Sequence, residues 1–325
     1  MTTSDTQRPG FGALCLRVLE GLGPYLGLAL VIAAFGAADP RLLQAEMLVT
    51  VFLQNLYVVL CALGMTFVIV SGGIDLSVGA ILALASVVTA WTLREGWPVP
   101  LAYAAGIGSG ALCGAINGLL IVGLRLVPFI ATLGMMGIAR GLAKWLAGLE
   151  TVNPGLDHPG FTFLEGLLVD AWWSPALWLT LALAALAAAL LKRSVFGLQV
   201  TAIGSNLETA RLCGVPVERR QLQVYTLSGL TAGLGGVALF GRLGLGDPTG
   251  GVAAELDVIA AAVIGGASLA GGVGSIAGAV AGALLMGVLD TGCVLLGWKV
   301  YVREVLTGAI IVAAVALDAL RGRST

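Results

Sequence analysis

The stretch KRSVFGLQVTAIGSNLETARLCGVPVERRQ, residues 192–221, is the one long polar segment between two hydrophobic blocks of this chain. It holds five of the 17 basic residues, namely Lys192, Arg193, Arg211, Arg219 and Arg220. Because Lys and Arg gather in the cytoplasmic loops of membrane proteins, this segment indicates which way the hydrophobic blocks face. Inside it, residues 206–213 predict a short helix that Gly214 and Pro216 end.

The composition places the rest of the chain in a membrane. Of its 325 residues, 58% are hydrophobic and 11% are charged, and the mean hydropathy is +1.00. A soluble domain has about 25% charged residues. We therefore predict an all-α, polytopic membrane helix bundle that forms a single domain over residues 1–325. The net charge of −1 gives no attraction to nucleic acid.

Apolar runs of about 20 residues predict about ten membrane-spanning helices, one or two of them short or broken. The segments are 22–38, 47–70, 78–93, 99–123, 128–148, 174–191, 223–245, 257–270, 274–296 and 304–319. Glycines at every fourth position, such as Gly110 with Gly114 and Gly229 with Gly233, predict helices that pack closely.

An even number of crossings puts both termini on one side of the membrane. Basic residues near the predicted cytoplasmic ends agree with this, and they are Arg8, Arg17, Arg125, Arg321 and Arg323. We expect residues 1–21 and the loop 192–222 in the cytoplasm, and the acidic loop 149–173 outside. A signal peptide cleaved near Ala38 is the alternative to an uncleaved first span.

Two glycine-rich strings indicate broken helices. VSGGIDLSVG (70–79) follows the second segment, and VIGGASLAGGVG (263–274) ends the eighth, which is too short to cross straight. The expected break positions are Gly72, Gly73, Gly265 and Gly266, and the likeness of the strings suggests an internal duplication. Glu255 and Asp257 precede the short segment, either as acidic residues of a helix start or as a gate.

Polar side chains near these breaks are candidates for a path through the membrane. Asp75 and Ser77 follow a Gly-Gly pair, where exposed backbone must be satisfied by protein or water. Asp75 would line the path or cap the helix that starts near Ser77. Asn117 would bind a hydroxyl group or join two helices, and Thr132 can bond to its own backbone.

Signatures of catalysis and of cofactor or metal binding are missing. The chain has no G-x-x-x-x-G-K-[ST] loop and no H-E-x-x-H, its one histidine, His158, lies in a polar loop, and its five cysteines are scattered. We predict no enzymatic activity, cofactor or metal site. Arg140 and Lys144 share one face of the fifth segment, and either line the bundle interior or reach an interface.

Five stretches together resemble the membrane permease subunits of ATP-binding-cassette importers for ribose and other simple sugars. They follow one another in family order: GMTFVIVSGGIDLSVGAILAL (64–84), NGLLIVGLRLVPFIATLGMMGIARGLA (117–143), AIGSNLETARLCGVPV (202–217), YTLSGLTAGLGG (225–236) and AELDVIAAAVIGGASLAGGVGSIAGAVAGALLMGVLD (254–290).

The resemblance implies a bacterial inner-membrane permease that imports a monosaccharide such as ribose, galactose, galactofuranose or xylose. A separate cytoplasmic ATPase would power it, a periplasmic sugar-binding protein would deliver the sugar, and the permease would pair with a second permease copy or paralogue within the membrane lipid. The ATPase would dock at the residues that match the family here, which are Gly204, Asn206, Ala210 and Gly214. Asp290 stands where the family often has Asn, so its charge needs a partner.

Two alternatives remain. A permease of the same type could carry a solute other than a sugar. An ion-coupled secondary transporter usually has ionisable residues at mid-membrane, and only Arg140 and Lys144 come near that description.

Overall fold

The computed structural model describes residues 11–322, with side chains from 22 to 316, and its regular elements are all helices. In chain order they are α1 (Phe11–Ala38), η1 (Pro40–Leu43), α2 (Ala45–Gln54), α3 (Leu56–Val70), α4 (Val78–Arg94), α5 (Val99–Gly123), α6 (Pro128–Ala147), α7 (Pro159–Leu167), α8 (Pro175–Arg193), α9 (Val195–Ser205), α10 (Leu207–Leu212), α11 (Val217–Leu243), α12 (Ala254–Ile264), α13 (Ile276–Leu295) and α14 (Val300–Gly322). The all-α prediction is confirmed.

Each of the ten predicted segments coincides with a helix or a helix pair, but length and composition support fewer crossings. Among the described residues, α5, α8, α11 and α13 are long and apolar enough to span a membrane, and the bent pair α2–α3 would be a fifth span. α4 and α12 have only 17 and 11 residues. The chain is a multi-pass membrane helix bundle, and ten crossings stay a prediction.

The second predicted segment, 47–70, is a bent helix pair and not one continuous helix. It divides at Asn55 into α2 and α3, which bend by 60°. The Asn55 side chain donates to the Val51 carbonyl (3.0 Å) and presses on α13, where a Cβ on Gly287 would lie 2.4 Å from its Nδ2. As a result α2 contacts α13, while α3 is buried along nearly its whole length.

The core surrounds α3 and α4, with α11 in contact with both. α5 packs on α11 backbone to backbone, because Gly110 and Gly114 face Gly229 and Gly233. A Cβ on Gly114 would lie 2.2 Å from the Tyr225 carbonyl oxygen, so a side chain does not fit there. This is the close packing that small residues at every fourth position allow.

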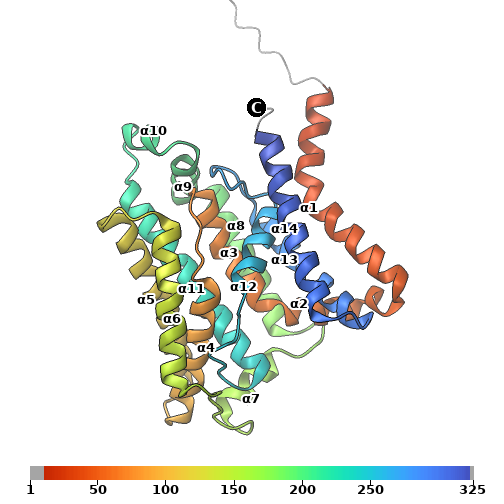
Figure 1. Cartoon of the computed structure of the whole chain (residues 1–325), viewed down its shortest axis with the longest axis vertical. Helices are drawn as coiled ribbons and strands as arrows, with labels where there is room; N and C mark the ends of the chain where they lie inside the picture. Colours follow the sequence, from red (N-terminus) through yellow and green to blue (C-terminus); the bar gives the residue numbers. More distant parts are fainter. Residues whose placement is uncertain (1–10, 323–325) are drawn as a thin grey trace, which may run out of the picture.

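The helix ends divide into two faces (Figure 1). α9 and α10 lie at one end of the molecule, together with the start of α1 and the end of α14, and α7 lies at the opposite end. The loop predicted over 149–173 contains α7, which the sequence analysis did not foresee. His158 caps it, with Nδ1 accepting a bond from the Gly160 N–H (3.1 Å).

Candidate functional site

A buried hydrogen-bonded cluster joins three helices at the break between α3 and α4. The Asp75 carboxylate accepts bonds from the Ser77 N–H (2.9 Å), the Ser77 hydroxyl and the Ser228 hydroxyl on α11 (2.8 Å). Ser77 Oγ accepts a bond from Asn117 Nδ2 on α5 (2.9 Å). All four side chains are buried. Asp75 therefore holds the entry to α4, and Asn117 makes a bond between helices.

Two polar atoms beside this cluster have no hydrogen-bond partner among the described residues. They are Asn117 Oδ1 and the Tyr225 hydroxyl oxygen. The Tyr225 hydroxyl faces the glycine break, where a Cβ on Gly73 would lie 2.2 Å from it. A buried group without a partner costs about 1–3 kcal/mol. The break therefore carries a polar cost that its packing does not offset with hydrogen bonds.

Thr132 on α6 approaches the same break. Its hydroxyl donates to the Pro128 carbonyl (2.9 Å) and lies 3.4 Å from the Ile74 carbonyl. The exposed fraction is 0% for each of the four residues predicted to line a path, Asp75, Ser77, Asn117 and Thr132. The role of these residues in a path stays a prediction, and it requires the break to open.

The two glycine-rich loops meet. Residues 71–77 join α3 to α4, residues 265–275 join α12 to α13, and the Gly272 N–H donates to the Val70 carbonyl (2.9 Å). Gly204 of α9 lies at the same point, since a Cβ on it would stand 1.9 Å from the Val70 oxygen and 2.6 Å from the Gly272 nitrogen. We call this contact between Val70, Gly204 and Gly272 the glycine junction.

The four predicted break glycines have two different roles. Gly72 (φ +82°) and Gly266 (φ +91°) adopt left-handed backbone conformations that glycine favours. Gly73 packs on the Tyr225 hydroxyl, and Gly265 packs on α13, where its Cβ would lie 2.4 Å from the Ala279 nitrogen. The predicted break after the short helix is therefore present, although α12 ends at Ile264, earlier than 270.

α9 and α10 form an elbow at the end of the molecule. Asn206 lies between them and caps α10, its Oδ1 accepting from the Thr209 N–H (2.8 Å). Ala210 is buried against Ile203 and Val217, and Gly214 (φ +78°) ends α10. The short helix predicted at 206–213 is confirmed, whereas the preceding helix α9 was not predicted.

The residues predicted for docking shape this elbow more than they project from it. Gly204 is in the glycine junction and Ala210 points inward. The most exposed large hydrophobic side chain of the elbow is that of Leu212, 89% exposed at the last position of α10, followed by Leu198 of α9 at 70%. A cavity of about 440 Å³ separates the elbow from the turn between α5 and α6, and Arg125 together with an Arg211–Glu218 ion pair (3.0 Å) lines it.

The acidic residues near the short helix differ in their partners. Asp257 lies 3.7 Å from Arg303 of α14, and Arg303 also forms an ion pair with Asp290 of α13. The charge of Asp290 therefore has a partner, but Arg303 is shared between two carboxylates. Glu255 Oε2 is buried without a hydrogen-bond partner among the described residues, next to Gly79, where a Cβ would lie 2.4 Å away.

Arg140 has a structural role in the membrane-spanning part. Its Nη1 donates to the carbonyls of Pro248 (3.0 Å) and Gly250 (2.7 Å), so α6 holds the loop that leads into α12. Lys144, one turn further on, is exposed. Arg140 is thus half-buried against a loop between helices, whereas Lys144 lies at the surface.

Comparisons with known proteins agree with this architecture. The family model described as branched-chain amino acid transport system / permease component matches residues 47–315. A ribose import permease of Bacillus subtilis is 40% identical over 307 residues, covering 93% of each chain. The chain belongs to this permease family.

Two further relatives transport other sugars by name. A fructose import permease of Rhizobium meliloti is 39% identical over 91% of this chain and 84% of its own. A xylose transport system permease of Escherichia coli is 33% identical over 91% of this chain and 90% of its own. No solved structure matches the chain. The predicted kinship with permease subunits of sugar importers is confirmed, and the permease is a transport subunit and not an enzyme.

The sequence analysis missed several residues of the permease that the structure brings together. Ser228 binds Asp75 from 153 positions away, and the only local signal for it was a hydroxyl inside a glycine-rich apolar helix. Gly272 and Val70 meet through backbone atoms, which no side-chain pattern reports. Leu212 was overlooked because a leucine in a short helix gives no sign of facing outward.

Proposed function

We propose that this permease moves a monosaccharide across the bacterial inner membrane into the cytoplasm, powered by a separate ATPase that docks on the α9–α10 elbow. The similarity to ribose, fructose and xylose permeases over about nine tenths of the chain is the observation that carries the substrate class. The exposed Leu212 at the tip of the elbow supports the docking site.

Charge supports a cytoplasmic position for the elbow. Cations on the opposite side are exceptions to the positive-inside pattern, and they are Arg41, Arg94, Lys299 and Arg303. Three of them have an acidic neighbour: Arg41 binds Asp39 (2.6 Å), Arg94 lies 3.7 Å from Glu95, and Arg303 pairs with Asp290. The hydrogen bonds from Arg41 also hold the pKa of Asp39 below its usual range. In contrast, Lys192, Arg193 and Arg219 form no ion pair among the described residues.

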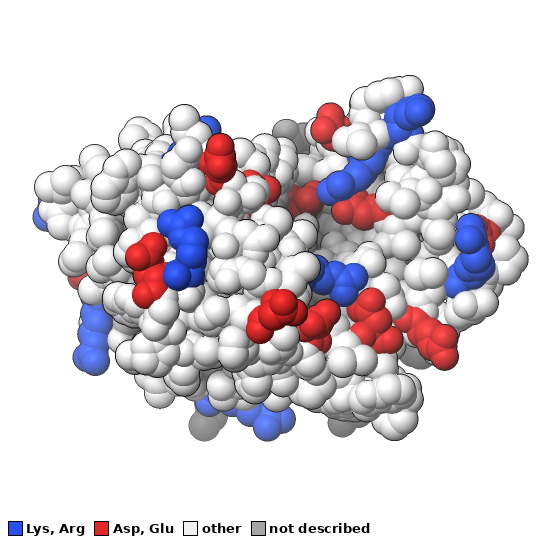
Figure 2. Space-filling model, turned by 90° about the horizontal axis from the view of Figure 1, so that it is seen from below, with Lys and Arg blue, Asp and Glu red and all other residues white. Residues whose placement is uncertain are grey.

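Both termini are proposed to share the cytoplasmic side with the elbow. The start of α1 and the end of α14 lie at the elbow end in Figure 1. Arg8 and Arg323, which the sequence analysis used for orientation, lie outside the described residues. The opposite face, at α7, would receive the periplasmic sugar-binding protein. Figure 2 shows that this face is hollowed, with charged side chains of both signs around the hollow.

Transport by alternating access would use the glycine junction. The elbow contacts the loops of both broken helices there, so ATPase closure against the elbow would be passed to the break that holds Asp75. The permease would pair with a second copy or paralogue, as the resemblance to importers of this kind implies. The buried cluster of Asp75, Ser77 and Asn117 would face the sugar only after that rearrangement.

The docking site is tested by the variant Leu212→Asp. We expect the ATPase no longer to co-purify with this variant and sugar uptake to be lost, while the permease stays in the membrane at its normal level. The matched control is Leu149→Asp, because Leu149 is 80% exposed after α6, outside the elbow. Normal ATPase recovery with Leu212→Asp would show that docking occurs elsewhere.

A second candidate function is the import of an amino acid, which the description of the matching family names. Uptake of labelled ribose, fructose, xylose and leucine by cells that express the permease with its partner proteins distinguishes the two. The proposal expects competition among sugars and no uptake of leucine.

A further inference from the structure

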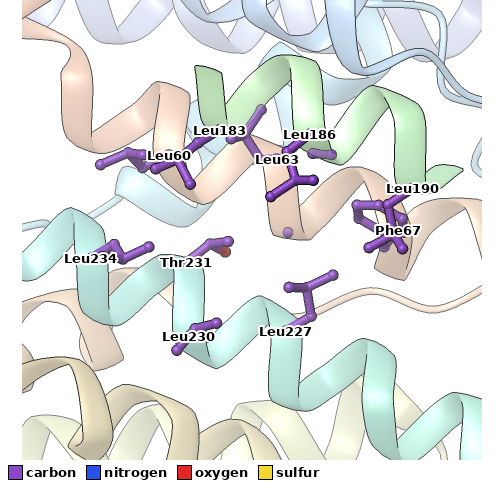
Figure 3. Close-up of a pocket in the computed structure, with 12 residues that line it drawn as sticks. Leu60, Leu63, Phe67, Leu183, Leu186, Leu190, Leu227, Leu230, Thr231 and Leu234 are labelled. Atoms are coloured by element: carbon purple, nitrogen blue, oxygen red, sulfur yellow. The ribbon is translucent and has the colours of Figure 1, made fainter. Parts of the chain in front are cut away.

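An apolar groove runs between α3, α8 and α11. Two cavities, of about 160 and 340 Å³, adjoin there and share Leu60, Leu183 and Leu234. Figure 3 shows leucines of α8 and α11 and Phe67 of α3 directed into the space between the three helices. Apart from two threonines and a glycine, the lining consists of apolar side chains, so the groove suits a hydrocarbon.

The groove opens on the outer surface of the bundle. Leu186 of α8 lines it and is 66% exposed, and Leu179 and Leu230 are exposed along its rim. Its α8 residues run from Pro175 to Leu190, which at 1.5 Å per residue is about 22 Å. Half of a hydrocarbon core of about 30 Å is about 15 Å. The groove is therefore long enough for the acyl chain of one leaflet.

One end of the groove leads to a cation without a carboxylate partner. Phe67, in the groove, packs on Phe196 (5.8 Å between ring centroids), and the Arg220 guanidinium lies 5.5 Å above the Phe196 ring. Arg220 donates to Gln199 (2.6 Å) and Gln223 (2.8 Å). It forms no ion pair with any residue that the structure describes, so its full charge is available to an anion.

Two further cations lie at the same end. Lys192 and Arg193 follow Leu190 in the last turn of α8 and are exposed, and neither has an acidic partner in the described part of the chain. Basic side chains between membrane helices bind anionic lipid headgroups, at about 1 kcal/mol per Lys or Arg near the surface. The apolar groove suits an acyl chain and the cations suit an anionic headgroup, which are the two parts of one lipid molecule.

We propose that this site binds an anionic phospholipid from the leaflet at the α9–α10 end. One acyl chain lies along α8 between α3 and α11, and the phosphate lies among Lys192, Arg193 and Arg220. The groove requires an acyl chain, and the unpaired cations select a negatively charged headgroup over a zwitterionic one. The lipid would fill the space between α8 and the core and hold α8 in place.

Lipid binding to the purified full-length permease tests the site. Dioleoyl-phosphatidylglycerol and dioleoyl-phosphatidylcholine are added in turn to the detergent-solubilised protein, and native mass spectrometry measures the occupancy of each. We expect phosphatidylglycerol to bind more tightly. Arg220→Gln should weaken the binding of phosphatidylglycerol by roughly fivefold. In the double variant Lys192→Gln/Arg193→Gln, each of the two charges removed should have an effect of the same size.

Leu186→Trp tests the groove separately, because the larger ring fills it and should expel both lipids. The controls are Leu119→Trp and Arg125→Gln. Leu119 is an exposed leucine on α5, and Arg125 lines the separate cavity between the elbow and the turn from α5 to α6. Both controls should bind phosphatidylglycerol as the unchanged protein does. Equal binding of the two lipids, or unchanged binding after Lys192→Gln/Arg193→Gln and Leu186→Trp, would overturn the proposal. If Arg220→Gln fails to fold, the double variant Lys192→Gln/Arg193→Gln still tests the charge requirement, because both of its residues are exposed.

Discussion

The backbone N–H of Gly272 donates a 2.9 Å hydrogen bond to the carbonyl of Val70, which joins the loops that follow two short helices far apart in the chain. Gly204 of α9 touches both partners of this bond. The elbow, the break before α4 and the break before α13 therefore share one contact point made only of backbone atoms.

Gly204→Ala is expected to lower the stability of the permease itself. The added Cβ would lie 1.9 Å from the Val70 oxygen, and overpacking of this kind costs about 1–3 kcal/mol. Thermal unfolding of the solubilised protein measures the loss. Gly134→Ala is the control, since nothing lies within 4 Å of that Cβ. If Gly204→Ala unfolds at the normal temperature and only ATPase binding is lost, Gly204 faces the partner and not the junction.

Asp75→Ala should destabilise the protein more than Ser228→Ala. The first variant leaves the Ser77 N–H and the hydroxyls of Ser77 and Ser228 without their acceptor, at about 1–3 kcal/mol for each buried group that finds no other partner. The second removes a single bond, which contributes about 1 kcal/mol. The free energies of unfolding of the two variants check the order. Equal values would mean that the Ser228 bond alone holds the cluster.

Asp290→Asn should change stability by less than about 1 kcal/mol, because the pair with Arg303 is partly exposed. Arg303→Gln should cost more, since it leaves Asp257 and Asp290 near each other without a cation. Combining the two substitutions should therefore restore part of the stability that Arg303→Gln removes. A double-mutant cycle on thermal unfolding measures this coupling. Strict additivity would show that the two carboxylates do not share Arg303.

Gly114→Ala should separate α5 from α11 and reduce the amount of folded permease. Its Cβ would lie 2.2 Å from the Tyr225 carbonyl oxygen, whereas a Cβ on Gly108 of the same helix meets nothing within 4 Å. Gly108→Ala is thus a matched control that should fold normally. Fluorescence-detected size exclusion of both variants gives the comparison, and similar peaks would contradict the close approach of the helices.

Apolar runs predicted where helices lie, because each run must exclude polar side chains to remain in lipid. They did not predict the bend at Asn55, where the side chain bonds to the Val51 carbonyl and packs against Gly287 of α13. α9 was missed for a related reason. Its residues 195–205 lie between cations, and that polar setting concealed a short apolar helix.

The candidate site was predictable only in part. The Gly-Gly strings identified the breaks, because glycine there meets a steric or conformational need that is local. Asp75 was identified, but its partner Ser228 was not, since the bond depends on how α11 packs against the break. The family motif found Gly204 and Ala210, yet a motif does not say whether a residue binds a partner or supports the residues that do.

The glycine contact between α5 and α11 also limits how the molecule can move. Packed helices slide past each other when the side chains between them change rotamer, and Gly110, Gly114, Gly229 and Gly233 have none to change. α5 and α11 should therefore travel as one rigid body. We expect the bending points of a transport cycle at the ends of this body, where α10 enters α11 and where α5 turns into α6, together with the break before α4.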